Sequence, residues 1–228
     1  MSEEPVTTGQ SIRAALQRGA WRLRMASCEQ PRLDAEVLLA CTLHVDRAFL
    51  LAHPERPLSD EEAAAYEAAL QRRAAREPLA YITGTRAFHG LELLVDARVL
   101  VPRPETEMLV ERALACWGPE ATPLLWDVGT GSGAIALAVA AQRPAARVVG
   151  SDVSAEALAV AECNRRRLGL GANVRWVRAD LLSAARGGID GVLANLPYLS
   201  ATEYAEAMPE VSQHEPRLAL EAGPQGME

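Results

Sequence analysis

The sequence predicts an α/β protein in which a parallel sheet is preceded by a small all-helical module. Three observations support this fold class. Short apolar runs alternate with helical segments over residues 124–194, a glycine-rich turn follows the first of these runs, and residues 8–76 contain only helical patterns. Because strands alternate with helices along the chain, we expect a parallel sheet with right-handed crossovers.

The composition of the chain is that of an ordinary globular protein. Its 228 residues, 49% of them hydrophobic and 23% charged, are enough for one medium domain and one smaller domain. No apolar stretch reaches the roughly 18 residues that a membrane span requires, and the N-terminal residues do not resemble a signal peptide. The net charge of −7 argues against a dedicated nucleic-acid binder, which usually carries a basic excess. We expect a cytoplasmic monomer with no membrane partner and no direct nucleic-acid partner.

The cysteine and histidine residues give no sign of a metal site. No two cysteines form a C-x-x-C pair, and the histidines do not have the spacing of metal ligands. We therefore predict no bound metal and reduced core thiols, as in a cytoplasmic protein. The four cysteines are Cys28, Cys41, Cys116 and Cys163.

Residues 1–77 are predicted to form the helical module. Apolar residues recur at near-helical spacing from Ile12 onward, and Pro31 suits the first turn of a second helix. Ser59 and Glu62, three residues apart, have the pattern of a capping box at the start of an alanine-rich helix. The apolar face of the second helix is expected to consist of Leu33, Val37, Leu38 and Cys41.

Residues 78–104 are predicted to link the helical module to the sheet domain. The segment from Tyr81 to Thr83 and residues 88–95 suggest short strands around turns, including a hairpin. The sequence VPRPETE at residues 101–107 contains two closely spaced prolines, which cannot both lie inside a helix, so we predict a rigid extended connector. A helix from about Thr106 to Cys116 is expected to follow.

Residues 105–228 are predicted to form a Rossmann-like domain. Its candidate strands are Leu124–Val128, Arg147–Ser151, Val174–Arg178 and Gly191–Ala194. Helices are expected directly after the glycine-rich turn and near Ala155–Leu168. Ligands of such sheets bind at the carboxyl ends of the strands. The polar residues at or just beyond these ends are Asp127, Asp152, Asp180 and Asn195.

The glycine-rich turn from Gly129 to Gly133 has the pattern of a nucleotide-type cofactor loop. Glycines let the backbone turn sharply and approach a ligand, and the following helix points free N–H groups at the same place. Asp152, 21 positions after Gly131, can accept hydrogen bonds from both ribose hydroxyls of an adenosine. Asp180 is placed to meet the adenine edge. The loop predicts an adenosine cofactor but leaves methyl and hydride transfer open, because Ala134 is a permitted variant of the third glycine in dinucleotide enzymes.

The segment Asn195–Tyr198, with the sequence NLPY, favours methyl transfer. It resembles the (D/N/S)-P-P-Y signature of S-adenosylmethionine-dependent methyltransferases that modify planar amide or amino nitrogens. Such a nitrogen is a poor nucleophile because its lone pair is delocalised. The side-chain oxygen of Asn195 and the carbonyl of Leu196 can accept its two hydrogens, which turns the lone pair toward the methyl group and stabilises the developing positive charge. Tyr198 is expected to pack against the planar group, and no general base is needed before transfer.

Several motifs together resemble the HemK/PrmC family. They are VPRPETE, DVGTGSGAIALAVA, ANLPY and HEPRLAL in the sheet domain and its connector, with RLDAEVLLA and PLAYITGTRAFHG before them, so the resemblance covers essentially the whole chain. Members of this family are N5-glutamine methyltransferases that act on the glutamine of the Gly-Gly-Gln motif in class-1 peptide-release factors. The resemblance implies S-adenosylmethionine as the cofactor, a release factor as the partner, and a helical module that helps to dock it.

The resemblance and the strand-end pattern together imply the residues of the site. The expected cofactor contacts are Asp127, Gly129, Thr130, Gly131, Ser132, Gly133, Asp152, Asp180, Leu181 and Asn195. The residues expected to hold the substrate glutamine and to act in catalysis are Asn195, Leu196, Pro197 and Tyr198. Arg103 and Glu105 in the connector are assigned to the substrate site, where they either cover the cofactor or brace the connector.

The sequence departs from the family pattern in two places. Leu196 stands where the family usually has proline, which keeps the carbonyl but lowers the rigidity of the backbone. The chain stops at Glu228, whereas family members continue with a helix and strands that complete a seven-stranded sheet, so an unpaired edge is expected on the fourth strand. Two alternatives therefore stay open: an adenine-N6 methyltransferase acting on DNA or RNA, which also uses N-x-P-Y, and a truncated, inactive homologue that only binds a release factor or cofactor.

Overall fold

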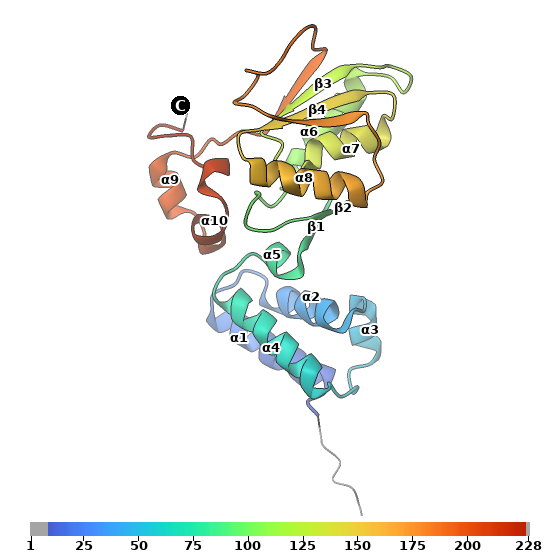
Figure 1. Cartoon of the computed structure of the whole chain (residues 1–228). Helices are drawn as coiled ribbons and strands as arrows, with labels where there is room; N and C mark the ends of the chain where they lie inside the picture. The colour runs from blue at the N-terminus through green and yellow to red at the C-terminus, as the bar shows by residue number, and fades with distance from the viewer. Residues whose placement is uncertain (1–8, 227–228) are drawn as a thin grey trace, which may run out of the picture. The chain divides into compact units, whose positions relative to one another are not determined.

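The computed structural model describes residues 9–226 and divides the chain into two units, one ending at Thr83 and one beginning at Gly84. The described part of the first unit contains helices and no strand, whereas the second contains both strands and helices (Figure 1). Each unit has a hydrophobic core of its own. The predicted fold class, a parallel α/β domain preceded by a helical region, is confirmed.

The first unit is built from helices that pack around one apolar core. Its helices are α1 (Ile12–Met25), α2 (Pro31–Leu43), α3 (Arg47–Ala52), α4 (Asp60–Ala74) and α5 (Leu79–Thr83). Side chains of Ser11, Asp46 and Ser59 cap α1, α3 and α4, and Pro31 occupies the first turn of α2. Tyr66 of α4 is fully buried in this core and donates its hydroxyl hydrogen to the carbonyl of Ala35, 3.2 Å away.

The capping box predicted at Ser59 and Glu62 is confirmed. The Ser59 side chain accepts a hydrogen bond from the Glu62 backbone N–H at 3.2 Å, and the Glu62 carboxylate accepts one from the Ser59 N–H at 2.8 Å. We expect Ser59→Ala to lower the free energy of unfolding by about 1 kcal/mol, because the Glu62 N–H in the first turn loses its side-chain acceptor. Urea unfolding followed by circular dichroism measures the change. Ser59→Thr, which keeps the hydroxyl, is the control, and equal midpoints for wild type and Ser59→Ala would contradict the prediction.

The buried face of α2 differs from the predicted one. Of the predicted face, Leu38 is buried, Leu33 and Val37 are half-buried and Cys41 is exposed, whereas Ala35 and Leu39, which were not predicted, are buried. The pattern was misleading because Asp34 lies in the core, where its carboxylate accepts a hydrogen bond from Nε of Arg73 at 2.8 Å. A carboxylate at a core position shifts the apparent apolar stripe around the helix.

The prediction of core thiols is correct for one cysteine. All four cysteines are free, and Cys28 is buried, but Cys41, Cys116 and Cys163 are exposed. The three exposed thiols lie on the solvent-facing sides of helices α2, α6 and α8. The prediction of a core position from residue type alone is therefore wrong for these three residues.

The segment from Tyr81 to Thr83 was predicted as a strand and is helical, in α5. The N–H groups of Tyr81 and Ile82 donate to the carbonyl of Pro78 at 3.0 and 3.3 Å. Proline starts this turn readily, because its fixed φ suits a first helical turn. The β-branched residues Ile82 and Thr83 favour a strand, but this local turn outweighs their preference.

The second unit begins with the predicted hairpin. Strands β1 (Thr85–Phe88) and β2 (Leu91–Leu94) are antiparallel, and Phe88 pairs with Leu91. The two loop residues, His89 and Gly90, both have positive φ, as a two-residue hairpin turn of type I′ requires.

The predicted extended connector at residues 101–107 is extended only as far as Arg103. Residues 104–106 form a turn of 3-10 helix, η1 (Pro104–Thr106), and α6 (Glu107–Cys116) follows directly. The predicted extended conformation is therefore wrong from Pro104 onward, because a proline at the first position of a helical turn loses no hydrogen bond.

The sheet of the second unit is parallel and has the order β5-β4-β3-β6. Its strands are β3 (Leu124–Val128), β4 (Arg147–Asp152), β5 (Val174–Arg178) and β6 (Gly191–Ala194). Helices α6, α7 (Ala134–Gln142) and α8 (Ala155–Arg167) lie on the same side of the sheet (Figure 1). All four predicted strands are confirmed, and only β4 differs, by one residue. Among the described residues β6 lies at the edge of the sheet, as predicted.

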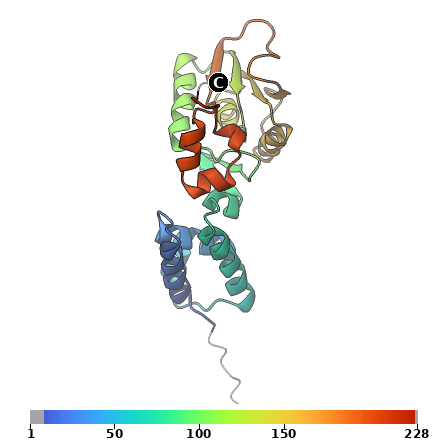
Figure 2. The ribbon, with the colours of Figure 1, turned by 90° about the vertical axis from the view of Figure 1, so that its left-hand side faces the viewer.

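The chain after β6 folds in front of the strands (Figure 2). It contains α9 (Ala201–Glu206), α10 (Pro209–His214) and η2 (Arg217–Ala219). The carbonyl of Leu220 accepts hydrogen bonds from the N–H groups of Tyr198 and Leu199 at 3.2 and 3.0 Å. These bonds hold the segment after η2 against the segment that follows β6. Between residues 9 and 226, no helix is long and apolar enough to cross a membrane.

Candidate functional site

A cleft with a volume of about 760 Å³ lies at the carboxyl ends of the strands in the second unit. Pockets of roughly 300–1,000 Å³ are typical of small-molecule and cofactor sites. Its walls come from six stretches of chain, within residues 97–106, 128–135, 152–157, 179–181, 195–197 and 216–226. The position agrees with the rule that ligands of parallel sheets bind beyond the carboxyl ends of the strands.

The glycine-rich loop between β3 and α7 forms the floor of this cleft. Gly129, Gly131 and Gly133 have φ values of 69°, 54° and 82°, in the left-handed region that favours glycine. A Cβ at Gly131 would meet nothing closer than a backbone oxygen at 4.0 Å, so this part of the loop is open to a ligand. Gly133 is the N-cap of α7, a helix whose residues from Ala134 to Ala140 are all buried.

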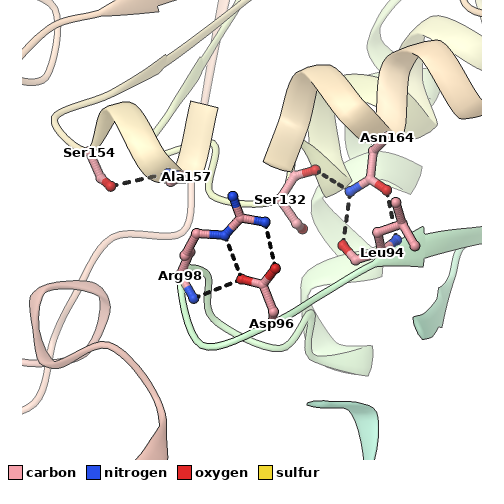
Figure 3. A network of polar contacts seen from close by, with 7 residues as sticks. All are labelled: Leu94, Asp96, Arg98, Ser132, Ser154, Ala157 and Asn164. Atoms are coloured by element: carbon pink, nitrogen blue, oxygen red, sulfur yellow. Dashed lines mark hydrogen bonds and ion pairs between the residues drawn. The ribbon is translucent and has the colours of Figure 1, made fainter. Parts of the chain in front are cut away.

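Asn164 of α8 holds the loop from behind, as Figure 3 shows. Its fully buried side-chain amide donates to the carbonyls of Ser132 and Leu94 at 3.0 Å each and accepts from the N–H of Leu94 at 2.7 Å. One amide therefore ties the glycine-rich loop to the end of strand β2. This residue was not identifiable from the sequence, because a single asparagine within a helix carries no recognisable pattern.

Asp127, at the end of β3, lies beneath the loop. Its side chain is fully buried, and Oδ2 accepts hydrogen bonds from Thr130 Oγ1 at 2.6 Å and from the Ala136 N–H at 3.1 Å. The other oxygen, Oδ1, is buried and has no hydrogen-bond partner among the described residues. Asp127 supports the loop and the start of α7, and it does not line the cleft.

Burial raises the pKa of the Asp127 carboxyl to about 7, against the opposing effect of the hydrogen bonds from Thr130 and Ala136. Between the ordinary pKa of 3.8 and this raised value, the folded chain binds more protons at this site than the unfolded chain. The contribution of this group to stability is therefore complete below pH 3.8 and is lost as the pH rises toward 7.

We expect the unfolding free energy of the wild type to fall relative to that of Asp127→Asn as the pH rises from about 4 to 7. Urea unfolding at a series of pH values measures both curves, and their difference isolates this carboxyl from the other titrating groups. Above pH 7 the difference should become constant. Parallel curves over the whole range would contradict the assignment of a raised pKa to Asp127.

Asp152, at the end of β4, lines the cleft and holds its floor. Its Oδ2 accepts a hydrogen bond from the Gly131 N–H at 3.0 Å, and its Oδ1 accepts one from the Ser154 N–H at 2.9 Å. The predicted neighbourhood of this carboxylate and the glycine-rich loop is therefore present in the structure.

Asp180 and Leu181, after β5, also line the cleft. Leu181 has a φ of 47°, which is unusual for a residue with a Cβ. Its carbonyl accepts a hydrogen bond from Ser151 Oγ at 3.3 Å, and that hydroxyl accepts one from the indole N–H of Trp126 at 2.8 Å. This chain of contacts from β3 through β4 fixes the backbone at Leu181.

The segment after β6 presents two free hydrogen-bond acceptors. Asn195 donates through Nδ2 to Thr106 Oγ1 at 3.1 Å. Among the residues that the structure describes, Asn195 Oδ1 and the Leu196 carbonyl accept no hydrogen bond. Both residues line the cleft together with Pro197, and a Cβ at Gly129 would lie 3.1 Å from Cδ2 of Leu196. The two acceptors are therefore on the same cleft as the glycine-rich loop. Tyr198 is 69% exposed and lies outside the cleft lining.

The two connector residues assigned to the substrate site do not line the cleft. Arg103 pairs with Glu215, a buried carboxylate that also accepts a hydrogen bond from the Val101 N–H at 3.4 Å. Burial raises the pKa of Glu215, and the guanidinium of Arg103 opposes this shift. Arg103 therefore braces the connector, which is one of its two predicted roles, and Glu105 is exposed.

Two walls of the cleft were not identified from the sequence. They are the stretch from Ala97 to Pro102 before η1 and the stretch from Pro216 to Gly226 near the end of the chain. The second includes part of HEPRLAL, a motif of the family resemblance that by itself indicates no contact with the cleft. Within residues 9–226, no group of three or more histidine, cysteine or acidic side chains could hold a metal ion.

The parallel sheet, the glycine-rich loop and the aspartate after the second strand are those of a methyltransferase domain. A family model described as "Methyltransferase domain" matches residues 126–214, and one described as "PrmC N-terminal domain" matches residues 14–84. The chain belongs to the release factor glutamine methyltransferase family, as its similarity to curated members shows.

Three relatives named "Release factor glutamine methyltransferase" illustrate this similarity. The protein of Bradyrhizobium diazoefficiens is 42% identical over 222 residues, which are 96% of this chain and 75% of the relative. That of Moorella thermoacetica is 42% identical over 219 residues, 96% of this chain and 77% of the relative. That of Chlorobaculum tepidum is 44% identical over 210 residues, 88% of this chain and 71% of the relative.

Proposed function

We propose that the chain transfers a methyl group from S-adenosylmethionine to the side-chain amide nitrogen of the glutamine in the Gly-Gly-Gln motif of a class-1 release factor. The observation that carries this proposal is the pair of free acceptors, Asn195 Oδ1 and the Leu196 carbonyl, beside the glycine-rich loop. A primary amide nitrogen carries two hydrogens, so two acceptors match it. The family of the chain supports the choice of a glutamine amide over other planar nitrogens.

The residues around the cleft fit the proposed cofactor. The open backbone at Gly131 admits close approach, and the cleft volume of about 760 Å³ is in the usual range for such ligands. Asp152 would accept hydrogen bonds from the ribose hydroxyls, and Asp180 and Leu181 would flank the adenine. The cofactor would supply an electrophilic methyl group on a positively charged sulfur, which would leave as a neutral thioether, and the methylated nitrogen would then lose one of its two hydrogens as a proton to water.

The residues after β6 would prepare the substrate nitrogen. Asn195 Oδ1 and the Leu196 carbonyl each accept one amide hydrogen, which fixes the nitrogen in the plane that exposes its lone pair. As positive charge develops on that nitrogen, both hydrogen bonds strengthen, so they stabilise the transition state more than the bound substrate. Holding the nitrogen in line with the methyl group supplies the rest of the acceleration through positioning.

The other residues of the segment have supporting roles in this proposal. Pro197 limits the backbone freedom of the segment. The exposed ring of Tyr198 is available to pack against the planar amide of an incoming protein substrate. The helical unit contributes to docking of the release factor. Because the proposed substrate is a translation factor, we expect the reaction to take place in the cytoplasm. We expect the enzyme to act as a monomer.

The proposal is tested by offering the purified chain labelled S-adenosylmethionine with a release factor, with duplex DNA and with ribosomal RNA in separate reactions. A factor with the Gly-Gly-Gln glutamine changed to asparagine is the matched control. Label on the wild-type factor and none on the control is the expected result. Label on nucleic acid would instead support an adenine-N6 methyltransferase, and bound cofactor with no label on any substrate would support an inactive binding protein.

A further inference from the structure

The side chain of Thr106 contacts the proposed catalytic residue Asn195. The two residues are 89 positions apart in the chain, and Asn195 Nδ2 donates to Thr106 Oγ1 across 3.1 Å. Both residues line the cleft. This is the hydrogen bond that the described structure gives to the Asn195 side chain, so the orientation of its amide depends on Thr106.

Thr106 does not perform the structural role that its position suggests. A threonine at the N-cap of a helix usually accepts a hydrogen bond from a backbone N–H of the first turn. Thr106 is the N-cap of α6, but its backbone is already helical, with φ −68° and ψ −20°, and its side chain makes no capping bond. The hydroxyl is therefore directed to Asn195 and not to the helix that it begins.

The position of Thr106 is fixed by the turn that precedes it. Its N–H donates to the carbonyl of Arg103 at 3.1 Å, which closes turn η1. Arg103 in turn pairs with the buried carboxylate of Glu215. Because the backbone of Thr106 is held in this way, its hydroxyl can act as a hydrogen-bond acceptor at a fixed position and orient a neighbouring side chain.

We propose that Thr106 is a positioning residue that sets the orientation of the Asn195 amide. An asparagine amide has a donor NH2 group on one side and an acceptor oxygen on the other. Because Thr106 Oγ1 accepts from the NH2 group, Oδ1 takes the opposite direction and is free to accept a hydrogen from the substrate amide. In the reversed orientation the NH2 group of Asn195 would face the NH2 group of the substrate amide, so Thr106 favours the productive orientation as long as its hydroxyl oxygen accepts from Nδ2. This inference rests on the proposed function, which assigns Oδ1 to the substrate.

Two variants distinguish the effect of the Thr106 hydroxyl from the effect of the shape of its side chain. Thr106→Val keeps the branched shape without the hydroxyl, and Thr106→Ser keeps the hydroxyl. Because the hydroxyl caps no N–H group, we expect both variants to fold with the wild-type melting temperature. We expect Thr106→Val to lower kcat for methyl transfer about ten-fold with an unchanged KM for the cofactor, and Thr106→Ser to restore kcat. Wild-type kcat in Thr106→Val, or equal losses in both variants, would overturn the proposal.

A second measurement does not depend on activity. The side-chain amide resonances of Asn195, assigned by their absence from Asn195→Ala, report its hydrogen bond in NMR spectra. They should shift in Thr106→Val and stay near their wild-type positions in Thr106→Ser. Unshifted resonances in Thr106→Val would overturn the proposal. The expected shift in a chain that methylates no release factor would support the positioning contact while the proposed function fails.

Discussion

Asn195→Ala is expected to lower kcat for methyl transfer by about 10²- to 10³-fold, the loss that follows when one preorganised partner of a developing charge is removed. The substitution removes Oδ1, one of the two acceptors for the substrate amide, and leaves the Leu196 carbonyl in place. The described hydrogen bond of the Asn195 side chain goes to Thr106 and not to the glycine-rich loop, so cofactor affinity should change little. Single-turnover transfer and calorimetric cofactor binding measure the two effects separately.

The comparison of these two effects decides the role of Asn195. Large loss of transfer with retained cofactor binding indicates that the side chain acts on the substrate. If transfer and cofactor binding fall together, Asn195 mainly shapes the cofactor pocket, and the assignment of Oδ1 to the substrate is wrong. A melting temperature equal to that of the wild type is required before either outcome is interpreted.

Asp152→Ala is expected to weaken cofactor binding by about 100-fold, because hydrogen bonds to a charged group are worth roughly 1.5–3 kcal/mol. In the described structure this carboxylate already accepts bonds from the N–H groups of Gly131 and Ser154. Its loss would therefore loosen the loop and remove the predicted partner of the ribose hydroxyls. Calorimetric titration with S-adenosylmethionine measures the dissociation constant directly.

Glu120→Ala is a matched control for Asp152→Ala. It removes the same charge from an exposed residue outside the cleft lining, and it should leave the dissociation constant unchanged. Equal affinities for wild type and Asp152→Ala would show that the carboxylate only shapes the empty loop. A parallel loss in Glu120→Ala would attribute the effect to net charge.

The sheet could be predicted closely because its strands are short segments rich in apolar residues that alternate with helical segments. Val174–Arg178 and Gly191–Ala194 were predicted with their observed bounds, and the glycine-rich loop marks the end of β3 without ambiguity. The buried strand β3 lacks alternation, as is usual for parallel strands, whereas β5 interleaves apolar residues with arginine and is buried only at Val174. Loops and strand ends of this kind depend on residues that are close together in the chain, so they can be recognised from the sequence alone.

The errors arose where local patterns compete with tertiary contacts. Asp34 is buried because Arg73, 39 positions away, supplies its partner, so the apolar pattern of α2 was misread. The turn at Pro78 converts the β-branched segment that follows it into a helix. In both places the interaction that determines the local structure does not appear in the periodicity of apolar residues.

The floor of the site and its walls at residues 179–181 and 195–197 were predictable, whereas the walls at residues 97–102 and 216–226 were not. Residues in motifs, such as Gly131 and Asp152, lie where the sequence pattern indicates. Thr106 acts through Asn195, which lies 89 positions away in the chain. Asn164 acts through Leu94 and Ser132, which lie 70 and 32 positions away. Single polar residues of this kind become recognisable only when the fold places their partners beside them.

The most direct test of the central claim is the identity of the atom that receives the methyl group. A release factor is incubated with the chain and S-adenosylmethionine carrying an isotope-labelled methyl group, and its peptides are analysed by tandem mass spectrometry and NMR. We predict the label on the side-chain amide nitrogen of the glutamine in the Gly-Gly-Gln motif. Label on any other atom of the factor would contradict the assignment of Asn195 Oδ1 and the Leu196 carbonyl as the acceptors that orient a glutamine amide.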